Sequence, residues 1–526
     1  MVPITSILTL ALFVAQAGST AFAQPAAVIE PQPNARPVPA GRWRGFNLMG
    51  RYAVQWTNTM TGFREPCFAA IADWGFNYVR LPIDYRSYSA SNDWLQFDPA
   101  GLECIDQAIA WGQQYGLHID LCLHRAPGYC SHDWAGRIVR LPPEQDLDLW
   151  KDAAAQEAFI QHWKMFARRY RKIDNDHLSF NLVNEPPALD PRRYARLMIQ
   201  TIDAIRAVSP GRLIVVDGLD MAKQPVLDAA LLAMTNVIQS RHCYDFTRFM
   251  SYRLYYVPDS DRWPEPHWPP LPMSAKLFGH YHQDKHCDGP LVVEGDFPPG
   301  TRVVLRVFQV SMPGTLVIQA DGRDLLKHEF AANAKDPEAK SIRLVQPWKI
   351  YQNVYDRDYT VTLAKPARQL TLQLTGSRSD WLSFDSLRLE MPGTNTVLLP
   401  LYEDEMPPAI YRAGPGWATL ASFPPGATRF YDLDHYLSDW KALQARGGRV
   451  MIGEFGQSNQ TPHRDALGYY EFLLKSFEQA GMGWACWDFD YPGGGGPVNS
   501  RRAGVDYEEL NGFQVDRPML DLMRRH

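Results

Sequence analysis

Features that mark several common protein classes are scarce or missing in this sequence. The chain has no basic tail or stripe: its 53 basic and 58 acidic residues are well mixed and leave a net charge of −5. That balance argues against nucleic acid as a partner. After the N-terminal segment no stretch approaches about 18 consecutive apolar residues, so we expect a soluble mature protein without a membrane partner. No C-x-x-C pair occurs, which argues against a structural zinc site.

Cysteine is scarce, and its seven residues are an odd number. Three stand inside apolar, strand-like runs and are expected to stay buried and reduced: Cys122, Cys243 and Cys486. The other four are better disulfide candidates in an oxidising compartment: Cys67, Cys104, Cys130 and Cys287. The sequence leaves their connectivity open.

Apolar residues, in contrast, make up 45% of the 526 residues, which allows a sizeable core and excludes global disorder. The length exceeds that of an ordinary domain but suits a large barrel with an added module. Aromatic residues reach 12% and include 16 Trp and 24 Tyr. That many tryptophans indicate either a large core or flat apolar surfaces that stack on sugar rings, and composition alone does not separate the two.

The N-terminus has the pattern of an export signal. Residues 4–18 are mostly apolar, and Ala21-Phe22-Ala23 forms an A-x-A cleavage site before Gln24, although no Lys or Arg precedes the apolar stretch. Five prolines in residues 24–40 indicate an extended leader. We therefore expect a signal peptide at 1–23, a proline-rich leader at 24–40, and a secreted or periplasmic mature protein.

Eight short apolar runs alternate with helical patterns from residue 45 onward. They are 45–50, 78–83, 118–124, 178–186, 213–218, 237–244, 450–456 and 483–489. Near-continuous apolar character is typical of parallel strands that are covered on both faces. Helices are predicted between them, as at Asp98 and Pro99, a capping residue and a first-turn proline, and at 154–172, 191–207, 433–446 and 464–480.

Eight strands alternating with helices predict an α/β fold of the (β/α)8 barrel type. The alternative is a doubly wound open sheet, which usually carries a glycine-rich phosphate turn after its first strand. The segment "NLMGRYAV" offers no such turn.

The sixth and seventh strands lie about 200 residues apart, far beyond a normal connection. Within this gap, period-two alternation broken by Pro and Gly predicts short strands of an all-β sandwich at 288–393. We therefore expect a barrel made of 41–287 and 394–526, with the sandwich inserted between barrel strand six and helix six. A barrel's active site lies on that face.

Polar and aromatic residues stand at the C-terminal ends of six predicted strands, and in a barrel these ends converge. They are Arg80, His124, Asn184, Glu185, His242, Tyr244, Glu454 and Trp487. A single His or Arg at such a place is more often structural, but eight such groups at one end are hard to explain as packing.

Two carboxylates at these strand ends are of particular interest. Strands four and seven are roughly opposite in an eight-stranded barrel, so Glu185 and Glu454 are expected to face each other. Hydrolysis of a glycoside with retention needs carboxyl groups about 5–5.5 Å apart, and inversion needs roughly 6.5–9.5 Å. Their pKa values must also differ, and we expect Arg80 to keep Glu454 anionic.

The motifs "YVRLP", "LHRAPG", "LVNEPP", "RHCYDF", "GEFG" and "WACWDF", in this order, resemble glycoside hydrolase family 5, the cellulase-like retaining barrels. The resemblance covers residues 41–260 and 425–524 but not the predicted sandwich. One departure is the sixth loop, which is usually compact in the family.

The resemblance implies Glu185 as general acid and base and Glu454 as nucleophile. It implies substrate-binding or supporting roles for Arg80, His124, Asn184, His242, Tyr244 and Trp487. It implies no metal and no organic cofactor.

Other aromatic and histidine clusters have two interpretations each. Trp263 and Trp268 are possible sugar platforms at the cleft edge, or packing residues of a proline-rich loop. The segment "GHYHQDKHC" (279–287) groups three His and one Cys, and we favour a solvated loop over a metal site. Several sandwich aromatics could form a glycan-binding face, as in carbohydrate-binding modules, or a core: Trp348, Tyr351, Tyr355, Tyr359 and Trp381.

These observations together predict a secreted, monomeric, retaining β-glycoside hydrolase with a polysaccharide or oligosaccharide substrate. Endo-acting cleavage of β-1,4-glucan is the first expectation. Two alternatives stay open: an exo-acting β-glucosidase or β-mannosidase on the same barrel, and a non-catalytic carbohydrate-binding protein. The intact pair of glutamates argues against the last. The sequence does not identify the sugar or the linkage.

Overall fold

The computed structural model describes residues 42–54, 60–90, 93–130, 147–257, 260–263, 265–268, 274–281, 289–346, 348–399, 410–422 and 436–526. The expected signal peptide and leader lie outside these residues, as do Cys287 and most of the histidine-rich segment 279–287. Among the residues described, no helix has the length and apolarity to span a membrane.

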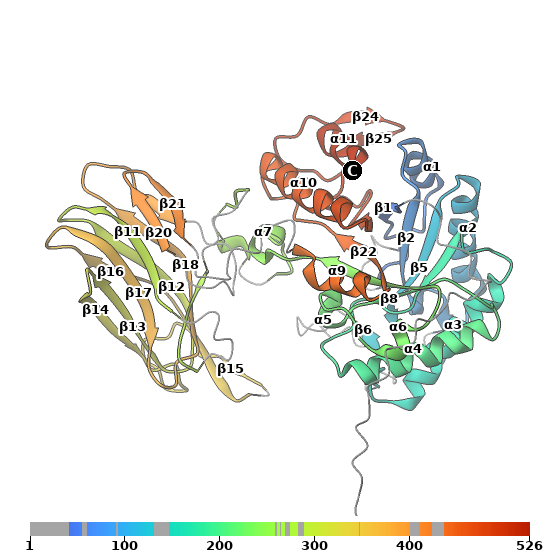
Figure 1. The fold of residues 1–526 in the computed structure, drawn as a ribbon, viewed down its shortest axis with the longest axis horizontal. Coiled ribbons are helices and arrows are strands. Elements are labelled where there is room, and N and C mark those ends of the chain that lie inside the picture. The colour runs from blue at the N-terminus through green and yellow to red at the C-terminus, as the bar shows by residue number, and fades with distance from the viewer. Residues whose placement is uncertain are drawn as a thin grey trace, which may run out of the picture. The chain divides into compact units, whose positions relative to one another are not determined.

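Eight parallel strands form a closed barrel (Figure 1). They are β1 (Arg44–Asn47), β2 (Tyr78–Asp84), β5 (His118–Ala126), β7 (Leu178–Asn181), β8 (Ile214–Asp217), β9 (Val237–Cys243), β22 (Arg449–Phe455) and β23 (Gly483–Cys486). The ring closes because β1 pairs with both β2 and β23. All eight predicted runs are strands, and the predicted (β/α)8 fold is confirmed.

Helices follow the strands and cover the barrel from outside (Figure 1). The longer ones are α1 (Glu65–Asp73), α2 (Pro99–Gln114), α3 (Ala153–Arg169), α4 (Pro191–Arg206), α9 (Ser438–Ala445), α10 (His463–Gln479) and α11 (Arg517–Arg525). The predicted cap of α2 is confirmed, because the Asp98 carboxylate accepts from the backbone N–H groups of Ala100 and Gly101. Asp190 caps α4 by accepting from the backbone N–H of Arg192.

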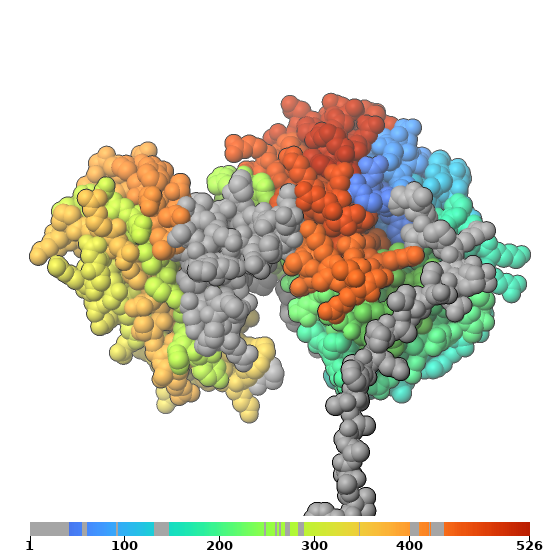
Figure 2. All heavy atoms as spheres, viewed as in Figure 1, coloured from blue at the N-terminus to red at the C-terminus, as the bar shows by residue number. Residues whose placement is uncertain are grey.

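The two ends of the described chain meet on the barrel. Besides the pairing of β1 with β23, the Asn511 side chain donates to Asp73 and accepts from the Trp74 indole. In the space-filling view the C-terminal residues in red accordingly lie beside the N-terminal ones in blue (Figure 2). The barrel is thus one folded unit, although its two parts are separated in sequence by the insertion.

Two β-sheets with a common apolar core lie between β9 and α9 in the sequence. One has the order β10 (Lys276–Phe278), β18 (Trp381–Glu390), β12 (Arg302–Ser311), β16 (Ile350–Thr362), β15 (Leu344–Val345), with β19 (Val397–Leu399) beside β18. The other has the order β14 (Arg323–Phe330), β13 (Gly314–Ala320), β17 (Ala367–Thr375), β11 (Leu291–Phe297), β20 (Ile410–Gly414), β21 (Trp417–Ser422). Leu305 and Leu387 of the first sheet and Ile318 and Leu372 of the second belong to that core.

These sheets follow barrel strand six in the sequence, and their strands extend beyond the interval 288–393. β10 precedes that interval and pairs with β18, while β19, β20 and β21 follow it. These strands are only three to six residues long and lack a clear alternation of their own. Tyr355 and Tyr359 lie in the core, whereas Trp348 is 71% exposed.

The expectations for the cysteines are confirmed for three residues and wrong for three others. Cys122, Cys243 and Cys486 are buried and free, as predicted. Cys67, Cys104 and Cys130, expected as disulfide candidates, are also free thiols. Cys67 lies within 3.4 Å of a carboxylate oxygen of Asp490, and Cys104 accepts from the Arg51 side chain.

Candidate active site

Polar side chains from several barrel strands meet at the C-terminal end of the barrel. Six of the residues singled out in the sequence are buried there: Arg80, His124, Asn184, Glu185, His242 and Glu454. Tyr244 and Trp487 are half-buried. Because all the strands run parallel, their C-terminal ends place these residues at one mouth of the barrel.

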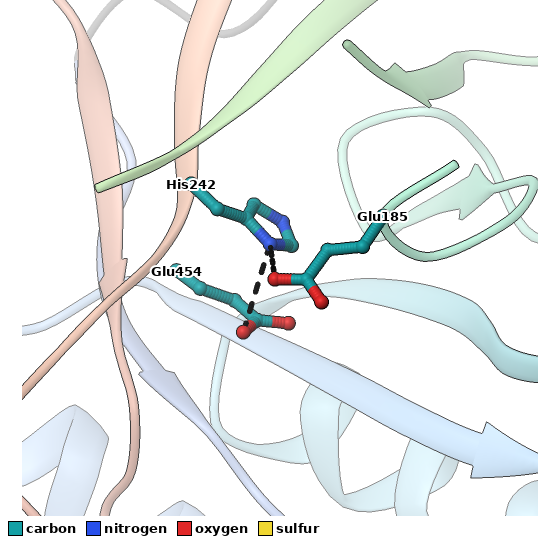
Figure 3. A group of neighbouring side chains, drawn as sticks. All are labelled: Glu185, His242 and Glu454. Atoms are coloured by element: carbon teal, nitrogen blue, oxygen red, sulfur yellow. Dashed lines mark hydrogen bonds and ion pairs between the residues drawn. The ribbon is translucent and has the colours of Figure 1, made fainter. Parts of the chain in front are cut away.

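Glu185, which follows β7, and Glu454, in β22, point toward each other across the barrel, with the His242 ring of β9 beside both (Figure 3). His242 Nδ1 lies 2.9 Å from Glu185 Oε1 and 3.6 Å from Glu454 Oε2. One carboxylate oxygen of each glutamate and a ring nitrogen of His242 all lie within 4.8 Å of one another. The two carboxyl groups are therefore close enough to act on one bond.

Glu454 is held at both of its oxygens. Arg80 Nη1 donates to Oε1 at 2.5 Å, and the Tyr244 hydroxyl donates to Oε2 at 2.9 Å. Burial raises the pKa of Glu454, while His242 and Arg80 lower it without cancelling the effect of burial. Arg80 is in the expected place, but it does not depress the pKa of Glu454 below its usual value, because the carboxyl group is only 3% exposed.

Arg80 itself lies in a fully buried cage of acceptors. Its Nε donates to Asn181 Oδ1, Nη1 also donates to Asn47 Oδ1, and Nη2 donates to Cys122 Sγ and Asn184 Oδ1, at 2.8–3.1 Å. With Glu454 these make five hydrogen bonds to the five N–H groups of a guanidinium. The cage fixes the plane of Arg80 and with it the orientation of Glu454.

Glu185 has an unusual backbone, with φ at 46° in the left-handed region. Contacts on both sides of the residue hold it there: its N–H donates to Asp217 Oδ2 at 2.9 Å, and its carbonyl oxygen accepts from the Tyr129 hydroxyl. Backbone strain of this kind persists where the surroundings over-determine it. The turn directs the Glu185 side chain back across the barrel mouth toward Glu454.

His242 lies among three carboxylates. Burial alone would lower the pKa of His242, but Glu454, Asp217 and Glu185 together outweigh burial and raise it. The neighbouring cation, Arg80, contacts Glu454 rather than the imidazole. The site thus favours a protonated His242 next to the glutamate pair.

Glu185, His242 and Glu454 also form the kind of group that can bind a metal ion. Their surroundings do not fit one. Both oxygens of Glu454 already accept from Arg80 and Tyr244, and the guanidinium would face a bound cation at short range. The donor set therefore suits acid–base chemistry better than metal binding.

Three rings form an aromatic wall beside the carboxylates. The Trp487 ring centroid lies 5.6 Å from that of His124 and 5.2 Å from that of Tyr52, and the latter two centroids are 4.5 Å apart. Trp487 is the half-buried member, whereas Tyr52 and His124 are buried. The wall supports Trp487 from one side and fixes its orientation.

Sequence reasoning missed four members of the site: Asn47, Tyr52, Asn181 and Asp217. The strand-end signal would have found two of them, because Asn47 ends β1 and Asp217 ends β8. Asn181 ends β7 but precedes the more prominent Asn184 and Glu185. Tyr52 lies in a loop and has no sequence signal of this kind.

Trp268 is half-buried among aromatic side chains of the barrel. Its ring packs against Phe246, Phe249 and Tyr469, and its backbone N–H donates to Asp465. These contacts favour the second of the two interpretations given above, a packing role. Trp263 is half-buried.

We expect Trp268→Ala to lower the free energy of unfolding by about 3 kcal/mol, the cost of a large aromatic cavity, and to leave kcat on a short substrate within about twofold. Urea titration of the purified variant and rate assays below the transition measure both. Tyr255→Ala is the matched control for loss of a ring, because Tyr255 is 80% exposed and its removal should change stability little. A large fall in kcat at unchanged stability would place Trp268 in the substrate site after all.

Comparisons with known proteins agree with this geometry. Residues 32–261 match the family model described as cellulase (glycosyl hydrolase family 5), and the residues after 261, Glu454 and Trp487 among them, lie outside the match. Endoglucanase C of Acetivibrio thermocellus is 30% identical over 158 residues, which are 30% of this chain and 43% of that protein. Cellodextrinase A of Ruminococcus flavefaciens is 29% identical over 200 residues, 37% of this chain and 55% of that protein.

The chain spans less than half the length of the first curated relatives it matches. A solved structure described as a glycoside hydrolase covers 92% of this chain and 99% of its own at a TM-score of 0.54 and 23% identity, which shows a shared fold. The chain thus resembles glycoside hydrolase family 5 across the first six strands of its barrel.

Proposed function

We propose that this protein is a retaining β-glycoside hydrolase that cleaves β-linked glucan, with endo-acting cleavage of β-1,4-glucan as the first candidate. The observation that carries the proposal is the buried pair of Glu185 and Glu454, which have oxygens within 4.8 Å of each other. Retention needs carboxyl groups about 5–5.5 Å apart, whereas inversion needs roughly 6.5–9.5 Å to admit a water molecule. The pair fits the shorter separation.

In this mechanism Glu454 attacks the anomeric carbon while Glu185 protonates the leaving oxygen. A covalent glycosyl–enzyme ester forms, and the glycosidic C–O bond breaks. Glu185, now a carboxylate, then takes a proton from water, which attacks the same carbon and releases Glu454. Arg80 and Tyr244 hold both oxygens of the nucleophile, so its orientation is fixed before substrate arrives.

Two neighbours suit the sugar itself. Asn184 Oδ1 accepts from Arg80 Nη2, which orients the amide so that its NH2 group can donate to a sugar 2-hydroxyl. Hydrogen bonds to this hydroxyl strengthen in the oxocarbenium-like transition state. The half-buried Trp487, supported by Tyr52 and His124, can stack beneath the sugar ring.

We expect the β-anomer of the product to appear first in a proton NMR time course of hydrolysis. Two displacements at one carbon restore the starting configuration, and mutarotation produces the α-anomer only later. The same time course without enzyme, started from pure product anomer, gives the mutarotation rate as the control. An α-anomer that appears first would indicate inversion and contradict the short carboxyl separation.

Endo action on β-1,4-glucan is supported by the match to Endoglucanase C. Exo action on the same barrel is the second candidate, because two other matches are Cellodextrinase A and a probable glucan 1,3-beta-glucosidase A of Emericella nidulans, 33% identical over 137 residues. Product profiles on barley glucan, carboxymethylcellulose, mannan, xyloglucan and aryl glycosides separate the candidates. Oligosaccharides of mixed length support endo action, and monomer alone supports exo action.

We further propose export of the protein after cleavage before Gln24, on the basis of the apolar segment and the A-x-A sequence. Mass spectrometry of protein recovered from outside the cytoplasm tests this, and a mature chain that retains Met1 would contradict it.

A further inference from the structure

A third carboxylate lies beneath the glutamate pair. Asp217 is the last residue of β8 and is completely buried. Its Oδ2 accepts from the Glu185 backbone N–H at 2.9 Å, and its Oδ1 accepts from Asn181 Nδ2 at 2.9 Å. Asp217 thus holds the backbone of Glu185 in its left-handed conformation.

Asp217 also faces both cations of the site. Its Oδ2 lies 3.3 Å from His242 Nε2, outside hydrogen-bond geometry, and 3.8 Å from Arg80 Nη2. The other ring nitrogen of His242, Nδ1, lies 2.9 Å from Glu185 Oε1. The imidazole therefore stands between two carboxyl groups, with one nitrogen toward each.

The charge of His242 determines how many of the neighbouring carboxyl groups it can donate to. A neutral imidazole carries one N–H and one acceptor nitrogen, whereas the imidazolium carries two N–H groups, one for each carboxyl group that the ring faces. With His242 charged, the site holds two cations and three carboxyl groups. The site has no net charge when one of the three carboxyl groups keeps its proton. The proposed mechanism requires that this proton is on Glu185.

We propose that Asp217 is a positioning residue with two roles: it fixes the backbone of Glu185, and as an anion it keeps His242 an imidazolium. The charged ring then donates from Nδ1 to Glu185 Oε1, which leaves Oε2 to carry the proton toward the leaving oxygen. This inference rests on the proposed role of Glu185 as acid and base.

The sign of the electrostatic effect follows from the groups around His242. Glu185 faces it from the segment after β7, Asp217 from β8 and Glu454 from β22, and Tyr244 directly follows its strand β9. Removing one anion from this group lowers the pKa of the groups that remain. Activity at high pH ends when the site loses a proton. Without the anion the site loses this proton at a lower pH than in the unsubstituted protein.

Two variants separate the two roles. Asp217→Asn removes the charge, and its NH2 group also conflicts with one of the two N–H donors that Asp217 accepts from. The double variant Asn181→Asp with Asp217→Asn exchanges the two side chains. In this double variant the carboxylate at 181 accepts from Arg80 Nε and from the NH2 group of the new amide at 217. The oxygen of that amide accepts from the Glu185 N–H. Every hydrogen bond of the two side chains is therefore kept.

We expect Asp217→Asn to lose about 10²-fold in kcat, because Glu185 is no longer held in place. The exchanged variant should recover most of that rate at its own optimum. In Asp217→Asn the basic limb of the pH–rate profile should move to lower pH by up to about three units, the effect of a unit charge about 4 Å away at an effective dielectric constant of about 20. The exchanged variant keeps a carboxylate at position 181, so its basic limb should move less. A wild-type pH profile in Asp217→Asn would leave Asp217 with a structural role only and overturn the proposal.

The protonation of His242 can also be measured without any substrate. In 15N NMR spectra of the full chain, the ring resonances of His242 are assigned by their loss in His242→Asn. We expect both ring nitrogens to carry protons near neutral pH in the unsubstituted protein, and the ring to titrate at lower pH in Asp217→Asn. A neutral His242 near pH 6 in the unsubstituted protein, or an unchanged midpoint in Asp217→Asn, would overturn the proposal even if no glycan proved to be a substrate.

Discussion

Glu454→Gln should remove turnover while leaving the fold intact, with kcat falling by on the order of 10⁴-fold or more, as for loss of a nucleophile. Gln keeps the size of Glu and an oxygen that can accept from Arg80, and its NH2 group can donate to the Tyr244 hydroxyl. The barrel should therefore unfold at a similar urea concentration. Steady-state rates on an activated aryl glycoside, together with urea titration, measure both effects.

A small external nucleophile then distinguishes the two glutamates. In Glu454→Ala, azide can occupy the vacated space and displace the leaving group once, which gives the α-glycosyl azide. In Glu185→Ala, azide attacks the covalent intermediate from the opposite face, and two displacements give the β-glycosyl azide. Activity of a well-folded Glu454→Gln protein, or azide products of the reverse configuration, would contradict the assignment of Glu454 as nucleophile.

The barrel could be predicted from sequence because its physical signal is local. Each strand is a short run of apolar residues, and each run is separated from the next by a helix that covers it, as "HIDLCLH" and the helix before it illustrate. The pairing of Glu185 with Glu454 then required only the position of each strand in a closed ring. No knowledge of side-chain geometry entered that step.

The surroundings of the pair were less accessible to sequence reasoning. Asp217 is the last residue of its strand, yet a single Asp before Gly reads as a turn residue. Its contacts with Glu185 and His242 join residues 32 and 25 positions away. Such contacts follow from the closure of the barrel and not from the local pattern.

Long-range contacts also surround Trp268. Its place in a proline-rich loop left two interpretations open, a sugar platform and a packing residue, and its ring packs on Tyr469 of α10, about 200 positions away. The expected effect of Arg80 on Glu454 was also incomplete, because sequence identifies the partner but not how deeply both are buried. Burial decides which of the two opposing effects on the pKa of Glu454 is larger.

Arg80→Met should be the most destabilising of the substitutions considered, with a loss of about 3–5 kcal/mol in the free energy of unfolding. It leaves buried acceptors on Asn47, Asn181 and Asn184 without their donor, and it leaves the charge of Glu454 without its closest cation. Removing a positive charge raises the pKa of Glu454, so the acidic limb of the pH–rate profile should move to higher pH. This is opposite in direction to the shift expected for Asp217→Asn.

Arg212→Met is the matched control for Arg80→Met, because Arg212 is also a buried arginine but donates to the backbone carbonyl groups of Tyr170, Ile173 and Leu178. It should lose stability without a change in kcat per folded molecule or in the pH profile. Urea titration and pH–rate profiles of the two variants, measured where each is folded, separate stability from chemistry. If Arg80→Met keeps the kcat and the acidic limb of the unsubstituted protein, the guanidinium supports the barrel alone and the proposed orientation of Glu454 by Arg80 is wrong.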